Sequence, residues 1–314
     1  MFCFSALLPI VLNTVCAFPI LDEGIEEAEL EALSVILESD MHWNRLHIAG
    51  NGIKPTQLRT LALSLKENTN LQELDLSQNF FGNEGAVFLA ELLKTNKFIH
   101  LLDVSENDIG PEGAKHLSVA LRENRSLRVL HVRRNKIGEE GVRAFAAALR
   151  ENKVLQKLDF SGNEMDSGGL KELLEAVRFN QTLRHMQLAG NSLGDPGARL
   201  LGEFFRGNKT VQSVTLSDCK ISPAGAKELA ENLVFCPCLS TLVLSHNDIG
   251  YAGAKAFAKV LQETRALQDL HLNGCHIGDD GARALETAIR DTLSLQFVDL
   301  SGMLLLSTST SFLS

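Results

Sequence analysis

A 28-residue pattern repeats from Trp43 onward, and this repetition constrains the fold more than any other feature of the chain. The clearest copy is the unit beginning at Leu127, LRVLHVRRNKIGEEGVRAFAAALRENKV. Arrays of such units grow by addition and share one continuous core, so 314 residues need not mean two ordinary domains. The units begin at Trp43, Leu71, Ile99, Leu127, Leu155, Leu183, Val211, Leu239, Leu267 and Leu295.

Apolar residues within each unit follow two different periods. Positions 1, 4 and 6 are apolar around a polar position 5, which is the alternation of a strand. Positions 16, 19, 20 and 23 are apolar with helical spacing. Position 9 is usually Asn, and we expect glycines at positions 12 and 15 to permit a tight loop with positive φ. Each unit is therefore predicted to run strand, loop, helix and return.

One unit cannot bury enough apolar surface to fold alone, so the units must stack. Stacked strands lie ~4.8 Å apart, whereas packed helices need ~8–10 Å. The helical side must therefore fan outward. The sequence predicts an α/β solenoid, a horseshoe with a parallel sheet on its concave face and helices on its convex face.

The ends of the chain depart from the pattern. Residues 1–14 form an uncharged, mostly apolar segment, and residues 15–42 are predicted to be a degenerate N-terminal capping repeat, with Phe18, Ile20 and Ile25 at strand and turn positions. A signal peptide over residues 1–17 and a membrane anchor stay open as alternatives, although no Lys or Arg precedes Arg45. Residues 43–303 are predicted to form the array, and residues 304–314 a non-repeat tail, disordered by composition.

The pattern LxxLxLxxNxIGxxGAxxLAxxLxxN over residues 43–300 resembles leucine-rich repeat proteins of the ribonuclease-inhibitor type. That class includes Ran GTPase-activating proteins and the C-terminal arrays of Nod-like receptors. The resemblance implies that the side chain at position 9 bonds backbone groups along a ladder between units. Cys219 and Cys275 occupy that position, which implies a structural role for both. The resemblance is specific for fold and weak for function, since the class shares a binding surface and not a reaction.

Other motifs give no catalytic, metal or cofactor site. Cys236 and Cys238 lack the two further ligands that a zinc site needs, and no phosphate-binding loop or nucleophile elbow occurs. The sequons at Asn124, Asn180 and Asn208 arise from the repeat and say little about secretion. Six cysteines in so long a chain favour reduced thiols and a cytoplasmic setting; secretion is the alternative if residues 1–17 are a signal peptide. The net charge of −9 argues against nucleic acid as a partner.

The concave face carries the candidate site, at positions 2, 3, 5, 7 and 8 of the units. Two neighbouring units are acidic there and the next is basic, so a bipolar docking surface could orient a partner of complementary charge. The alternative is a solvated surface with cross-strand pairs such as Asp103 with His131 and Glu106 with Arg134. The candidate residues are Glu73, Asp75, Asp103, Glu106, Arg128, His131, Arg133, Arg134, Lys157, Arg184 and His185.

The sequence therefore predicts a non-enzymatic scaffold that binds a protein partner on the concave face, with no small-molecule substrate and no membrane span. Two alternatives stay open: a GTPase-activating protein resembling the Ran activators, and a fragment or isoform of a regulatory protein of the Nod-like receptor type. Ribonuclease inhibition fits the negative charge but not the low density of cysteines and aromatic residues.

Overall fold

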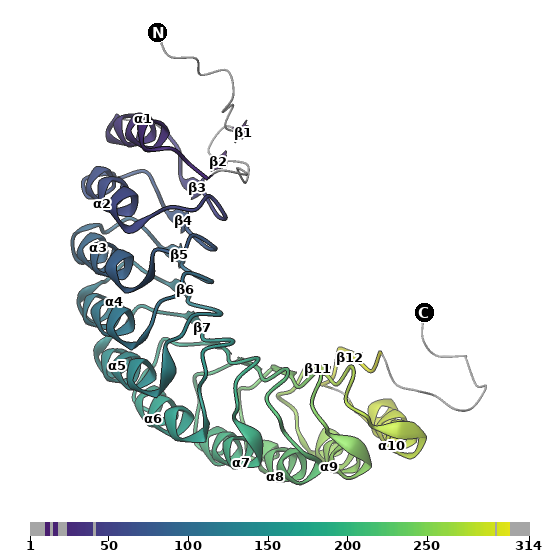
Figure 1. The fold of residues 1–314 in the computed structure, drawn as a ribbon. Coiled ribbons are helices and arrows are strands. Elements are labelled where there is room, and N and C mark those ends of the chain that lie inside the picture. The colour runs from purple at the N-terminus through teal and green to yellow at the C-terminus, as the bar shows by residue number, and fades with distance from the viewer. Residues whose placement is uncertain (1–9, 13–14, 18–23, 40–41, 293, 302–314) are drawn as a thin grey trace. The chain divides into compact units, whose positions relative to one another are not determined.

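The computed structural model describes residues 10–12, 15–17, 24–39, 42–292 and 294–301. These residues form two compact units, each described here by itself (Figure 1). The first unit comprises Met1–Glu164 with Glu175–Leu183, and the second comprises Met165–Leu174 with Arg184–Ser314. Within each unit strands and helices alternate, as predicted for a repeat array.

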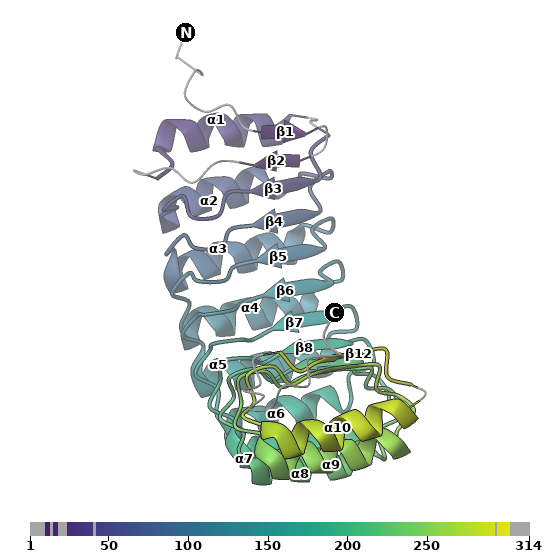
Figure 2. The ribbon, with the colours of Figure 1, turned by 90° about the vertical axis from the view of Figure 1, so that its right-hand side faces the viewer.

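The first unit is a sheet whose strands follow chain order, with helices on one side of it (Figure 2). Pairing from β2 to β7 is parallel, and each residue from β3 onward pairs with the residue 28 positions later, as Asp75 does with Asp103. The strands are β1 (Ile10–Leu12), β2 (Val15–Ala17), β3 (Arg45–His47), β4 (Glu73–Asp75), β5 (Leu101–Asp103), β6 (Val129–His131) and β7 (Lys157–Asp159). The helices are α1 (Glu27–Glu38), α2 (Pro55–Ser64), α3 (Gly82–Thr95), α4 (Pro111–Glu123) and α5 (Gly138–Glu151).

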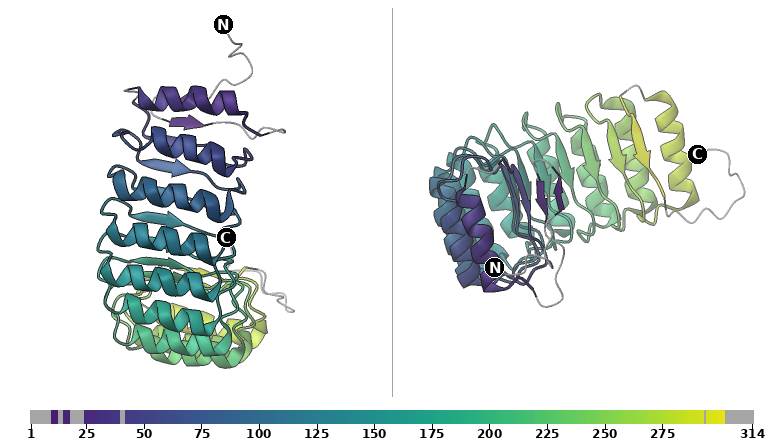
Figure 3. Two further views of the ribbon diagram at one scale, coloured as in Figure 1. Left: turned by 60° about the vertical axis from the view of Figure 1, so that its left-hand side comes forward. Right: turned by 90° about the horizontal axis from the view of Figure 1, so that it is seen from above.

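The second unit repeats the same arrangement, and its strands from β8 to β12 pair in parallel (Figure 3). Helix α6 (Ser167–Val177) contributes residues to both units. The strands are β8 (His185–Gln187), β9 (Ser213–Thr215), β10 (Thr241–Val243), β11 (Asp269–His271) and β12 (Phe297–Asp299). The helices are α7 (Gly194–Phe205), α8 (Pro223–Leu233), α9 (Gly250–Glu263) and α10 (Gly278–Asp291).

The core of each unit lies between its sheet and its helices. In the copy that begins at Leu127, the strand-period residues Leu130 and Val132 and the helix-period residues Phe145 and Leu149 are buried. The two predicted periods are therefore confirmed. Because the helices cover one side of each sheet, position 5 of each strand is left on the helix-free side, which we call the open face and which corresponds to the predicted concave face.

An asparagine ladder joins consecutive repeats at position 9. The Oδ1 of Asn107 accepts the N–H of Asn79, 28 residues earlier, at 2.8 Å. Its Nδ2 donates to the carbonyl of Leu76 at 2.8 Å. Cys219 takes the same role, since its Sγ donates to the Leu188 carbonyl at 3.3 Å. Burial raises the pKa of the Cys219 thiol to about 12, so the thiol stays protonated and can donate.

A second ladder, which the sequence reasoning did not anticipate, runs along the other end of the repeats at position 26. The Nδ2 of Asn124 donates to the carbonyl of Leu93 at 2.7 Å, and its Oδ1 accepts the N–H of Leu127 at 2.7 Å. Asn152 and Asn180 repeat these bonds. The predicted sequons fall on this ladder, so their asparagine side chains are buried structural groups.

The glycines at positions 12 and 15 serve different purposes. Gly138 and Gly250, at position 12, have φ values of 60° and 59°, which confirms the expected tight loop. At position 15 the expectation of positive φ was wrong, because Gly141 lies inside α5. A Cβ built on Gly141 would lie 2.8 Å from the Cβ of Ala114 in the preceding helix. Glycine at this position therefore leaves room both for Ile137 of its own repeat and for the preceding helix.

The first repeat differs from the others in register. Val15 pairs with Arg45, 30 residues later, whereas the predicted spacing of 28 would place Ala17 there. Helix α1 keeps the spacing of 28, since its Leu30 and Leu37 are buried like Leu58 and Leu65 of the next repeat. The connection between β2 and α1 is therefore two residues longer than in the later repeats. The prediction of a 28-residue strand spacing was wrong here.

The predicted domain boundaries are otherwise not tested by the fold. Ile10–Leu12 within the predicted apolar segment 1–14 forms β1, which pairs antiparallel with β2. Phe18, Ile20 and the predicted tail 304–314 lie outside the described residues. The capping role of residues 15–42 stays a prediction.

The ladder at position 9 predicts a large loss of stability when Asn107 is replaced. Asn107→Ala removes the acceptor for Asn79 and the donor for Leu76 in a fully buried turn, so we expect a loss of about 2–4 kcal/mol in the free energy of unfolding. Asn107→Cys should lose less, because Cys219 and Cys275 donate equivalently at this position. Urea denaturation, with amide exchange at Asn79 as the local measurement, checks this. Equal losses for both variants would contradict the ladder's role.

Candidate functional site

The candidate site is the open face of the first unit, where Asp-x-Ser sequences end several strands. In β4, β5 and β7 the aspartate at position 5 accepts the N–H of the serine at position 7, at 2.9 to 3.0 Å. This bond fixes the turn and turns the carboxylate toward the sheet. The copy on β6 departs from the rule, with His131 at position 5 and Arg133 at position 7. The N–H of Arg133 donates instead to the Oγ of Ser105, at 3.2 Å.

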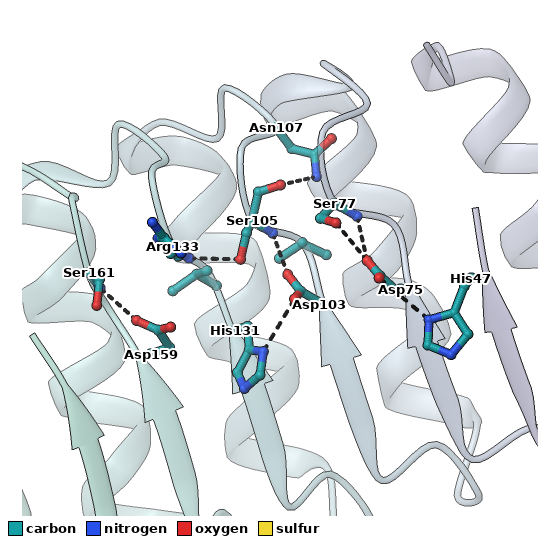
Figure 4. A network of polar contacts seen from close by, with 12 residues as sticks. His47, Asp75, Ser77, Asp103, Ser105, Asn107, His131, Arg133, Asp159 and Ser161 are labelled. Carbon is teal, nitrogen blue, oxygen red and sulfur yellow. Dashed lines mark hydrogen bonds and ion pairs between the residues drawn. The ribbon is translucent and has the colours of Figure 1, made fainter. Parts of the chain in front are cut away.

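The position-5 row places Asp75 and Asp103 side by side, where like charges repel (Figure 4). Each carboxylate is turned toward a histidine on its other side. Asp75 lies 3.5 Å from Nδ1 of His47, and Asp103 lies 3.2 Å from Nδ1 of His131. Burial raises the pKa of Asp103, but hydrogen bonds from His131 and Ser105 outweigh it, so its pKa is below the ordinary value.

The remaining acidic candidates are also paired. Glu73 lies 3.0 Å from the Nε of Arg45, and Glu106 lies 3.4 Å from a guanidinium nitrogen of Arg134. Both cross-strand pairs that the sequence suggested, Asp103 with His131 and Glu106 with Arg134, are therefore present. Such half-exposed pairs contribute under ~1 kcal/mol each. Each acidic candidate of the predicted bipolar surface thus already has a side-chain partner within the first unit.

Three basic candidates remain available for a partner. Within the described part of the chain, the side chains of Arg128, Arg133 and Lys157 make no hydrogen bond or ion pair. Arg128 and Arg133 are exposed and Lys157 is half-buried. Arg128 directly precedes β6, Arg133 lies in the turn after β6, and Lys157 begins the neighbouring strand β7. The three therefore lie on two neighbouring repeats of the open face, and we call them the basic cluster. The chain has a net charge of −9, so the positive charge of this cluster is opposite in sign to that of the protein as a whole.

Arg184 and His185, the last two predicted site residues, belong to the second unit. A guanidinium nitrogen of Arg184 donates to the Thr210 carbonyl at 3.0 Å, which holds that side chain against its own unit. We therefore do not include Arg184 and His185 in the basic cluster.

Phe80 is an exposed aromatic residue that the sequence reasoning missed. It lies at position 10, in the turn after β4, and is 76% exposed. Its φ of 59° is costly for a bulky side chain. Because the nearby Gly82 N–H donates to the Asn107 carbonyl, this turn lies against the turn that carries Glu106. The signal was available in the sequence, since other units place Gly, Asp, Lys, Glu, Ser or His at position 10.

A family model described as "Leucine Rich repeat" matches eight segments that together cover more than half of the chain. The chain is a leucine-rich repeat protein. The repeat array of this leucine-rich repeat protein is of the type that serves as a scaffold for protein–protein interaction. The matched segments are residues 67–90, 95–118, 123–146, 151–174, 179–202, 207–230, 235–258 and 265–285. No curated protein matches the chain.

Among the similar solved structures, the Rad7 and Elc1 complex supports the fold. A chain of the yeast Rad7 and Elc1 complex is 16% identical, with a TM-score of 0.57 over 88% of this chain and 67% of that one. The tropomodulin C-terminal domain of Caenorhabditis elegans is 14% identical, with a TM-score of 0.41 over 48% of this chain and 92% of that one. The leiomodin-1 actin-binding site 2 is 23% identical, with a TM-score of 0.41 over 48% of this chain and 87% of that one. At these identities the likeness concerns fold alone.

Two searches of the described residues bear on other chemistry. None of the helices in that part of the chain has the length and apolar character to cross a bilayer. The same residues contain no group of three His, Cys, Asp or Glu side chains arranged to hold a metal ion.

The low pKa of Asp103 predicts a pH-dependent contribution to stability. A depressed pKa in the folded state stabilises the protein above the ordinary pKa of about 4, and this contribution disappears as pH falls through the folded value. Asp103→Asn should therefore cost on the order of 1–2 kcal/mol at neutral pH and progressively less below pH ~4. Urea denaturation of both proteins across this range measures the difference. A cost that stayed constant with pH would show that Asp103 does not act through its charge.

Proposed function

We propose that this protein is a non-enzymatic scaffold whose first unit binds an acidic surface of a protein partner. The observation that carries the proposal is the contrast among charges on the open face. Glu73 and Glu106 each pair with an arginine, and Asp75 and Asp103 each face a histidine. Arg128, Arg133 and Lys157 have no ion-pair partner among the described residues. Of the bipolar docking surface that the sequence predicts, the proposal therefore keeps only the basic residues as the binding site.

Charge and rigidity support this choice of partner chemistry. The backbone beneath the cluster loses little freedom when a partner binds, because the ladder and the parallel pairing already fix it. Opposite charge steers an acidic partner to the cluster and fixes its orientation. Arginine also forms paired hydrogen bonds with carboxylates, which lysine does not.

Phe80 offers a partner an exposed apolar contact, which the arginines alone do not provide. Its turn and the turn that carries Arg133 are two strand spacings apart, or ~10 Å, which is well within one protein interface. Aromatic and arginine side chains together are typical of the residues that dominate binding energy. A partner that places an apolar side chain against Phe80 and carboxylates against Arg128 and Arg133 fits this surface.

A cytoplasmic setting is part of the proposal. It is supported by the thiols of Cys219, Cys236, Cys238 and Cys275, none of which forms a disulfide in the described part of the chain. Three of them are buried, and two donate to carbonyls of the preceding repeat.

Reversal of the unpaired cations should abolish capture of the partner. We expect proteins retained by the full chain from a cell extract to be lost with the double variant Arg128→Glu, Arg133→Glu, with an affinity loss of at least about tenfold. Affinity capture followed by mass spectrometry identifies them, and titration with the purified partner measures the loss. The lost partners should carry an acidic surface.

Arg150→Glu is the matched control, because Arg150 is an exposed arginine in the last turn of α5, on the helical side. It makes the same kind of charge reversal at one position on the helical side and should leave capture intact. If the double variant and Arg150→Glu retained the same proteins as the intact chain, the basic cluster would not be the docking site.

Phe80→Gly separates binding from folding. Glycine adopts a φ of 59° without cost, and Gly52 occupies the same position in the preceding repeat, so the thermal midpoint should stay the same or rise. Affinity for the captured partner should fall at least about fivefold, because an exposed anchor is lost. Calorimetry gives the midpoint and titration gives the affinity. An unchanged affinity would remove Phe80 from the interface.

A further inference from the structure

A groove between α8 and α9 lies on the helical side of the second unit, away from the open face. Its volume is about 590 Å³. Its apolar lining comes from Val234, Phe235, Tyr251, Ala252, Ala256 and Val260. From Tyr251 to Glu263 it follows α9 for thirteen residues, a length of ~18 Å. We call this feature the α8–α9 groove.

Two aromatic residues in this groove are not required by the repeat. Phe235 is 56% exposed and Tyr251 is 49% exposed, so neither contributes its full area to the core. Several other repeats carry acidic residues at these positions. The position of Phe235 carries Glu67, Glu123, Glu151 and Glu263, and that of Tyr251 carries Glu139, Asp195 and Asp279. Phe179 is an exposed aromatic residue at the position of Phe235 in another repeat, whereas Phe235 and Tyr251 line one groove together, so that their rings form a shared apolar surface suited to binding.

The same exchange leaves the groove basic. Its rim carries Lys227, Lys255 and Lys259 but only Glu231 and Glu263 as acids, and Lys227 lies 3.9 Å from Glu231. Arg206 adds a fourth cation, with its guanidinium carbon 4.6 Å from the centre of the Phe235 ring. Lys255 lies 5.9 Å from the centre of the Tyr251 ring. Each aromatic ring thus has a cation beside it, an arrangement that suits a ligand with both apolar and anionic groups.

We propose that the α8–α9 groove is a second docking site, which binds an acidic peptide segment of a protein partner. The peptide places bulky apolar side chains against Phe235 and Tyr251 and carboxylates against Lys255 and Lys259. All residues of this site belong to the second unit, so the proposal can be tested independently of the basic cluster.

Selection from a phage-displayed library of random peptides of about twelve residues tests the proposal. Peptides are selected on the full chain and counter-selected against the double variant Phe235→Glu, Tyr251→Asp. Both substitutions introduce residue types that the repeat already carries at these positions, so the variant should fold, as circular dichroism and the thermal midpoint verify. We expect enriched peptides rich in Asp and Glu around one or two large apolar residues.

A synthetic copy of the most enriched peptide is then titrated by fluorescence anisotropy. Its affinity should fall at least about tenfold with Phe235→Glu, with Tyr251→Asp and with Lys255→Glu combined with Lys259→Glu. Phe179→Glu is the matched control, because Phe179 is 70% exposed and occupies the same repeat position as Phe235 but does not line the groove. It should leave the affinity unchanged.

Three results would overturn the proposal. The first is that no peptide is enriched, and the second is that enriched peptides bind the groove variants as tightly as the intact chain. The third is that peptides bound in the groove are basic or uncharged, which would refute the acidic ligand.

Discussion

The bond from one repeat's asparagine to the preceding repeat's turn is the interaction on which the rest of the structure depends. Each turn after a strand buries backbone groups that neither the strand nor the helix can satisfy. Asn107 satisfies those of the turn at Asn79, and Asn135 does the same for Asn107. No repeat therefore completes its own hydrogen bonding, and an unpaired buried group would cost ~1–3 kcal/mol. The repeats must stack in register.

That constraint separates the residues used for folding from those left for function. Positions 1, 4, 6 and 9 face the core or the ladder, and their side chains vary little between repeats. The open face and the helical surface are not constrained in this way. A residue that departs there from what other repeats carry is thus a candidate for binding. Arg133, where other repeats carry Ser, Ala or Asn, and Phe80 are such departures in the first unit, and Tyr251 is one in the second.

Much of the fold could be predicted from the sequence because two short periods and a fixed spacing specify it. The ladder at position 9 followed from the family pattern. The ladder at position 26 was missed because an Asn near a helix end also suits an ordinary cap. The close approach of Gly141 to the preceding helix involves a neighbouring repeat. The pattern within one repeat does not show this contact, so the glycine was interpreted as part of a turn. The two-residue shift of β2 was not predicted because the repeat pattern before Trp43 is too degenerate to fix the strand register.

The candidate site was predicted less well, for a physical reason. The sequence locates charges on a face but not which of them neutralise one another. Whether Asp103 turns toward His131 or toward Asp75 depends on side-chain geometry across strands. Once these pairs are known, each acidic candidate is seen to have a partner in its own unit. The basic cluster keeps its charge, and Phe80 emerges only when the turn positions are inspected as well as the strand.

The salt dependence of partner binding tests the central claim most directly. If unpaired cations of the basic cluster bind an acidic surface, the affinity of the captured partner should fall steadily as salt rises from about 0.05 to 0.5 M, because screening shortens the reach of the charges to a few ångströms. Neutral variants at Arg128 and Arg133, such as Gln, should flatten that dependence. A dependence equally steep in the intact and neutralised proteins would contradict the account.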